Sequence, residues 1–165
     1  MALTRELAGA ANEQLKLNRL SQLAEDKQRA GALRGRAAGI EARVSDLPEQ
    51  PDDTAFRTRA LWTADEIDGL QTAAAQVFGL AADAAGKAAV ELTWLRDQIQ
   101  AIRDVPINMG YDYPRSFPNE EWRTRRAAAL TSLRELMQHA LISADLADSQ
   151  GKQLSAASAL PGRSG

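Results

Sequence analysis

The sequence predicts an all-α protein, built as an elongated, coiled-coil-like antiparallel helical hairpin with a third helix that completes a three-helix bundle. Two observations carry this prediction: apolar residues recur every three or four positions over long stretches, and the two longest stretches are joined by a short proline-containing connection. Apolar stripes at this spacing indicate amphipathic helices. A short connection between two such helices makes them antiparallel neighbours.

The longest apolar stripe lies between Asp53 and Arg103, and we expect a helix over 54–104. About fifty helical residues would make a rod of roughly 75 Å, which needs partners to bury its stripe. Thr63-Ala64-Asp65-Glu66 has the spacing of a capping box, so a break near Trp62 is the alternative. The continuous helix is favoured because the stripe keeps its phase on both sides. Its members are Phe56, Ala60, Ile67, Leu70, Ala74, Val77, Ala81, Ala84, Ala88, Leu92, Leu95, Ile99 and Ile102.

Residues 2–46 read as the first long helix, which ends before two prolines at 48 and 51. Gly31, Gly35 and Gly39 share one face, where they either admit another backbone or simply meet solvent. The charges favour pairing with 54–104, since residues 1–48 hold eight Lys/Arg against six Asp/Glu and residues 49–104 hold five against ten. The stripe comprises Leu3, Leu7, Ala10, Leu17, Leu20, Ala24, Ala30, Leu33, Ala37, Ile40, Val44 and Leu47.

The remaining sequence predicts an irregular loop, a third helix and a tail. Three prolines and a glycine over 105–118 forbid a regular helix. Asn119 then caps a helix over 119–149, and 150–165 is small, polar and proline-containing, which is typical of a tail. Residues 1–149 therefore make a single helical domain. On the central helix, Phe78, Leu80, Val90 and Trp94 form a second apolar flank for the third helix or another subunit.

Composition excludes several kinds of chemistry. The chain has no cysteine and one histidine, and no arrangement of metal ligands or nucleophile and base stands out, so we expect no metal, no cofactor and no enzyme activity. A net charge of −2 disfavours general binding of nucleic acid. No run is apolar for long enough to span a membrane, and the first residues carry charges where a cleavable signal peptide would be apolar. We expect a cytoplasmic protein or a part of an assembled particle.

The richest recognition chemistry lies in 111–126, where aromatic residues and arginines alternate. Tyr, Trp and Arg dominate the energetics of protein interfaces. The same residues would also serve as a plug at the end of the bundle, and the sequence leaves both interpretations open. The predicted partner-binding residues are Tyr111, Tyr113, Arg115, Phe117, Trp122, Arg123 and Arg126.

One short motif resembles a family. Arg134-Glu-Leu-Met-Gln-His139 is similar to the Arg-x4-His signature of HEPN ribonucleases, which are all-α proteins. The resemblance implies that Arg134 would steady a phosphate and that His139 would act in RNA cleavage. It covers only these residues, and the long first hairpin is not suggested by that family.

The sequence favours a non-catalytic structural or assembly protein that works through helix-mediated contacts in a larger complex, such as a phage virion or a secretion machine. Self-association or a multi-subunit partner is expected, and no small-molecule substrate is evident. The alternative is a monomeric regulatory adaptor that presents 111–126 to one protein partner. A HEPN-like ribonuclease is the third interpretation.

Overall fold

The computed structural model describes residues 2–105 and 117–159 of the 165-residue chain. In those ranges the chain forms helices and their connections, without a strand. The helices are α1 (Ala2–Ser45), α2 (Asp53–Thr58), α3 (Ala64–Ala75), α4 (Ala81–Arg103) and α5 (Asn119–Ala159). The predicted all-α class is therefore confirmed, as is the start of the last helix at Asn119. Among the helices described here, none is long and apolar enough to cross a membrane.

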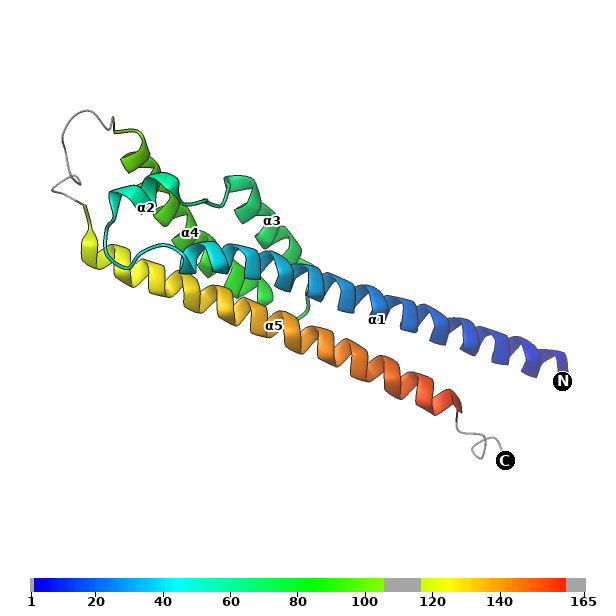
Figure 1. Cartoon of the computed structure of the whole chain (residues 1–165). Coiled ribbons are helices and arrows are strands. Elements are labelled where there is room, and N and C mark those ends of the chain that lie inside the picture. The colour runs from blue at the N-terminus through cyan, green and yellow to red at the C-terminus, as the bar shows by residue number, and fades with distance from the viewer. Residues whose placement is uncertain (1, 106–116, 160–165) are drawn as a thin grey trace.

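The long antiparallel pair of the molecule consists of α1 and α5 (Figure 1). On one half of this pair, α3 packs against α1, α4 packs against α5, and α3 and α4 pack against each other. Four helices thus enclose one core at what we call the bundled end, drawn at the left in Figure 1, where the short α2 also contacts α4. The predicted helical hairpin is present, but the second long helix is α5 instead of the 54–104 stretch.

The predicted central stripe is the core of the bundled end, since all its members except Ala60 are buried. A single helix over 54–104 is nevertheless wrong, because the stretch contains α2, α3 and α4. At the first break, the Thr63 hydroxyl accepts a hydrogen bond from the Glu66 backbone N–H at 3.0 Å, which completes a capping box. Extended backbone before Thr63 lets Trp62 turn into the core, where its Nε1 donates to the Leu92 carbonyl oxygen at 3.0 Å.

The second break, between α3 and α4, was not predicted. It follows the cap residue Gln76 and contains Gly79, which has a positive φ of 95°. A residue with a side chain adopts this conformation only with strain, so a glycine here permits the reversal. The turn folds α4 back along α3, and it leaves Phe78 and Leu80 outside the core.

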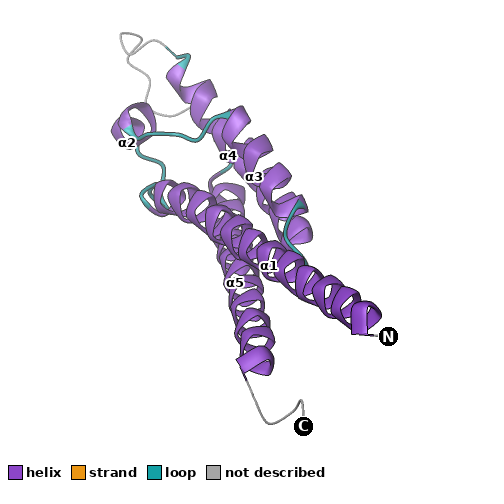
Figure 2. Ribbon diagram, turned by 90° about the vertical axis from the view of Figure 1, so that its right-hand side faces the viewer, coloured by secondary structure: helices purple, strands orange, loops and turns teal. Residues whose placement is uncertain are grey.

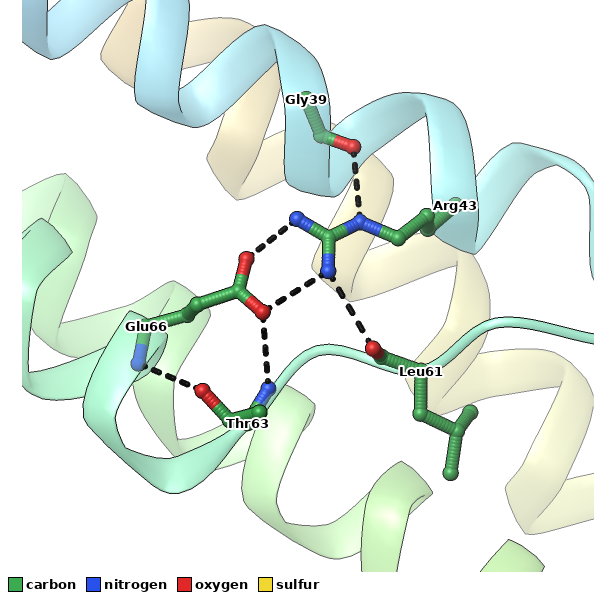
Figure 3. A network of polar contacts seen from close by, with 5 residues as sticks. All are labelled: Gly39, Arg43, Leu61, Thr63 and Glu66. Carbon is green, nitrogen blue, oxygen red and sulfur yellow. Dashed lines mark hydrogen bonds and ion pairs between the residues drawn. The ribbon is translucent and has the colours of Figure 1, made fainter.

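An ion pair fastens the first break to α1 (Figure 3). Arg43 donates to the Glu66 carboxylate through both terminal nitrogens and to the Leu61 carbonyl oxygen at 3.2 Å. The hydrogen bond from Arg43 is the main reason that the pKa of Glu66 lies below its ordinary value, and the cap at Thr63 lowers this pKa further. The same bond raises the pKa of Arg43. Glu66 therefore closes the capping box of α3 and holds α1 beside it.

Burial along α1 and α5 is uneven. Among the side chains described, the first buried residue of α1 is Leu23 and the last buried residue of α5 is Ala147. Beyond these points both helices continue and diverge, as Figure 2 shows. The predicted end of the third helix near 150 is wrong, because α5 runs through Gly151 to Ala159. Leu154 and Leu23 line a common hollow, and Lys152 pairs with Asp148 at 3.2 Å across Gly151, so contacts offset the weak helix propensity of the glycine.

Candidate functional site

Most of the predicted partner-binding residues that the structure describes lie inside the bundled end. Trp122 is buried, and its ring centroid lies 4.7 Å from that of Phe56 and 5.8 Å from that of Phe117. The Trp122 indole Nε1 donates to the Pro48 carbonyl oxygen at 3.0 Å. The three rings therefore close the core between α2 and the start of α5. Tyr111, Tyr113 and Arg115 lie outside the described residues.

The arginines of this segment divide between two environments. Arg126 donates to the carbonyl oxygens of Leu47 and Ser45, each at 3.0 Å, and so satisfies backbone acceptors at the end of α1. Arg123 is exposed, one residue beyond the buried Trp122. A partner that approached this end of the molecule would contact the Arg123 side chain before it reached Trp122 or Arg126. The role of these residues in binding stays a prediction.

The residues of the ribonuclease-like motif lie on α5. The Arg134 guanidinium donates to the Glu41 carboxylate on α1 at 3.2 Å, and His139 is half-buried. Within the part of the chain that the structure describes, no group of three or more His, Cys, Asp or Glu residues is placed to hold a metal ion. Cleavage of RNA through Arg134 and His139 stays a prediction.

Beyond Leu23 and Ala147, α1 and α5 separate, and we call this region the fork. Its base is held by two contacts between the helices: Lys27 to the Asp148 carboxylate at 2.9 Å, and Arg19 to the Gln150 side-chain oxygen at 3.2 Å. The hydrogen bond from Lys27 is the first cause of the lowered pKa of Asp148. Because these side chains are exposed, the two contacts join α1 to α5 but add little to the free energy of folding.

At the base of the fork, a groove of about 260 Å³ is bounded by α1, α5 and the α3–α4 turn. Its apolar lining includes Leu23, Val77, Phe78, Leu146 and Ala147. Arg19 and Asp26 add one charge of each sign, and Gln150 adds a neutral amide. Phe78 is 95% exposed and Leu146 is 56% exposed. Aromatic and aliphatic side chains that gather at a hollow and remain open to water are typical of a protein-binding surface.

The four residues of the predicted second apolar flank lie in two different environments. Trp94 is half-buried, and the Arg125 guanidinium of α5 lies 4.8 Å from the centre of its ring, so α5 is the neighbour of this residue. Phe78, Leu80 and Val90 are exposed. Sequence reasoning identified the flank, but it missed the groove, because Leu146 and Leu23 come from helices whose pairing was not predicted. The Phe78-Gly79 pair was the available local signal of the turn.

The arrangement can bind apolar side chains, and its rim can pair with charges of either sign. Comparison with protein-family models, with curated proteins and with solved structures finds no match for the chain.

Proposed function

We propose that the protein is a non-catalytic assembly component that joins a larger complex through helix-mediated contacts at the fork. The observation that carries this proposal is the exposure of Phe78 beside Leu146 over an apolar groove, in a molecule whose other phenylalanines are packed. A phenyl ring left in water contributes nothing to folding, whereas its burial by a partner would contribute roughly 1.5–3 kcal/mol. A virion or a secretion machine is an assembly of the kind proposed.

The shape of the fork supports a helical partner segment. A second hollow lies between α1 and α5, where the half-buried Leu20 and Gly151 lie at the surface above the buried Leu23 and Ala147. A helix that enters between two helices presents apolar residues three and four positions apart to such walls. In the adaptor alternative, 111–126 would contact the partner. The described residues Trp122 and Arg126 of this segment make their contacts mainly inside the molecule, so we propose the fork as the contact surface instead.

The test is the size of the native assembly. The tagged chain is expressed in its source cells, and the cleared extract is separated by sedimentation. We expect the wild-type chain to travel far ahead of a 17.8 kDa monomer, and the double variant Phe78→Asp/Leu146→Asp to travel as a much smaller species. Val90→Asp is the control, because it adds a single aspartate at an exposed apolar site outside the groove.

Either of two results would refute the proposal. If the wild-type chain sediments as a monomer, it does not belong to a larger complex. A double variant that stays in the complex, with Val90→Asp behaving in the same way, would remove the fork as the contact surface. Circular dichroism of each purified variant checks that the helices are intact.

A further inference from the structure

A second surface, separate from the groove, runs along the outer side of α1. Its residues repeat in alternating steps of three and four, and all are exposed and uncharged, a set that we call the α1 seam: Leu7, Ala10, Gln14, Leu17, Ser21, Ala24, Gln28 and Gly31. The side of α1 that packs on the bundle carries other residues, among them Leu23, Ala30 and Leu33. The seam therefore has the period of a coiled-coil interface, and no residue in the described ranges 2–105 and 117–159 covers it.

The charges beside the seam indicate what covers it. One flank repeats every seven residues and changes sign along the helix, with Glu6 and Glu13 before Leu20 and with Lys27 and Arg34 after it. The four charged side chains are exposed. Such flanking positions choose the partner of a coiled coil and its direction. A flank that is acidic in its first half and basic in its second half is complementary to its own reverse.

We propose that α1 binds the α1 of a second copy of this chain, antiparallel along the seam, a contact that goes beyond the proposed function. In this register Glu6 of each copy faces Arg34 of the other, and Glu13 faces Lys27. Leu20 meets Leu20 at the two-fold axis. Each of the two pairings occurs twice, so the dimer gains four ion pairs, as the isologous symmetry of a two-fold contact requires.

The same register fits the sizes of the seam residues. Leu7 of one copy falls opposite Gly31 of the other, and Leu17 falls opposite Ser21. A side-chain carbon built on Gly31 would meet no heavy atom within 4 Å, so this position is open to a neighbouring helix. On the other flank, Asn18 meets Asn18 and Ala11 meets Glu25, which brings no like charges together.

A parallel pair of the same helices would lack this complementarity. In a parallel coiled coil the flank that carries Glu13 and Lys27 faces the opposite flank of the second helix. There, Glu13 would meet Asn18, and Lys27 would meet Ala32. The charges therefore favour the antiparallel pair. The contact would extend over roughly 42 Å, from position 6 to position 34.

The test is a charge exchange between two variants of the full chain. Glu6→Lys/Glu13→Lys makes the whole flank basic. Lys27→Glu/Arg34→Glu makes it acidic and is combined with Asp148→Asn, because Lys27 also pairs with Asp148 at the base of the fork. Each variant alone replaces four attractive pairs by repulsive ones, and we expect its dissociation constant to rise about tenfold or more. An equimolar mixture restores four attractive pairs, so we expect a mixed dimer with an affinity near that of the wild type.

Mass is followed by light scattering over roughly 1–300 μM, a range chosen for a contact with small core layers. Arg5→Glu/Lys16→Glu is the control, because both residues lie on α1 away from the seam and its flank, and it should associate as the wild type does. Circular dichroism checks that each variant is helical.

A purified wild-type chain that stays at 17.8 kDa throughout would overturn the inference, as would a mixture that associates no better than its two components. Either result leaves the proposed function standing if the wild-type chain still sediments in a large complex in extracts. Conversely, a chain that dimerises by charge exchange but travels in extracts only as that dimer would retain the α1 contact and refute the larger assembly.

Discussion

The two ends of the molecule use the same helices for different purposes. At the bundled end, α1 buries Leu33, Ala37 and Ile40 against its neighbours. The side chains of Trp122 and Arg126 donate hydrogen bonds to carbonyl oxygens of the loop that follows α1. At the open end, the same helix leaves Leu7 and Leu17 in water. Helix hydrogen bonds form along the whole of α1, so the difference between the ends lies in side-chain packing. Packing supplies stability at one end, and its absence leaves apolar side chains exposed at the other.

Hydrogen exchange should give the largest contrast. Amides of residues 33–44 open only when the bundle unfolds, whereas amides of residues 6–19 open by local fraying of one helix. With a global stability of at least about 5 kcal/mol, we expect protection factors that differ by about a thousandfold or more between these two segments of α1. The measurement is native-state exchange at a concentration low enough to keep the chain monomeric. Equal protection in the two segments would contradict the division of the molecule into two ends.

Trp122→Ala tests the bundled end. Removing a fully buried indole should lower the free energy of unfolding by about 3–5 kcal/mol, because it opens a cavity beside Phe56 and Phe117 and leaves the Pro48 carbonyl oxygen without its donor. Urea unfolding followed by circular dichroism measures the change. The neighbouring Arg123→Ala should change stability by less than about 0.5 kcal/mol, because Arg123 is exposed. A loss below about 1 kcal/mol for Trp122→Ala would show that this cluster does not close the core.

Much of the core could be predicted from the sequence, but the connections could not. Periodicity identified most of the buried residues from Phe56 to Ile102, because burial depends on the face of the helix that a residue occupies. It missed Trp62, Ala85 and Ala89, which are buried, and the predicted stripe on α1 included Leu7, Ala10, Leu17 and Ala24, which are exposed. The capping box at Thr63 was visible but was outweighed by the continuous stripe. Gly79 is a weak signal until its positive φ is known. The continuation of α5 past Gly151 depends on α1, which no local pattern reveals.

The functional residues were harder to predict for a chemical reason. Indole and guanidinium groups donate hydrogen bonds and cover apolar area equally well toward a partner or toward the interior. Composition alone therefore could not assign Trp122 and Arg126 to one environment or the other. Phe78, by contrast, was predicted as part of a second apolar flank for the third helix or another subunit, and the turn at Gly79 places it at the groove.

The capping box is a smaller test of how the bundled end is held. Thr63→Ala removes the side chain that accepts from the Glu66 N–H, and we expect a loss of about 1 kcal/mol in the free energy of unfolding. Thr72→Ala provides the matched control, because Thr72 is exposed within α3 and caps nothing. Equal effects of the two substitutions in urea unfolding would argue against a stabilising cap at Thr63.

The lowered pKa of Glu66 adds a pH dependence to the same contact. A carboxyl group whose pKa is lower in the folded state stabilises the fold fully above its unfolded value, near the ordinary 4.5. This contribution is lost as pH falls through the folded pKa. We expect the wild-type chain to lose more stability than Glu66→Gln when urea unfolding is repeated from pH 6 down to about pH 3. Parallel pH profiles for the two proteins would contradict this account.

Phe78→Ser should have the smallest effect on stability. The side chain is 95% exposed, so its removal should change the free energy of unfolding by less than about 0.5 kcal/mol. Phe56→Ser provides the contrast, because Phe56 is buried in the aromatic cluster and should cost several times more. If Phe78→Ser were as destabilising as Phe56→Ser, Phe78 would belong to the core and the groove would lose its main residue. Urea unfolding of the two variants decides between these outcomes.

The unpacked part of α1 is also long enough to turn a small rotation at its base into a large displacement of its tip. The helix extends roughly 30 Å beyond its first buried residue, Leu23. A rotation of about 10° at that point would displace the tip by about 5 Å, close to one helical turn. Small adjustments at the base, where Lys27 meets Asp148, are therefore amplified at the far end. The tip of α1 can therefore move by about one helical turn while the core stays as it is.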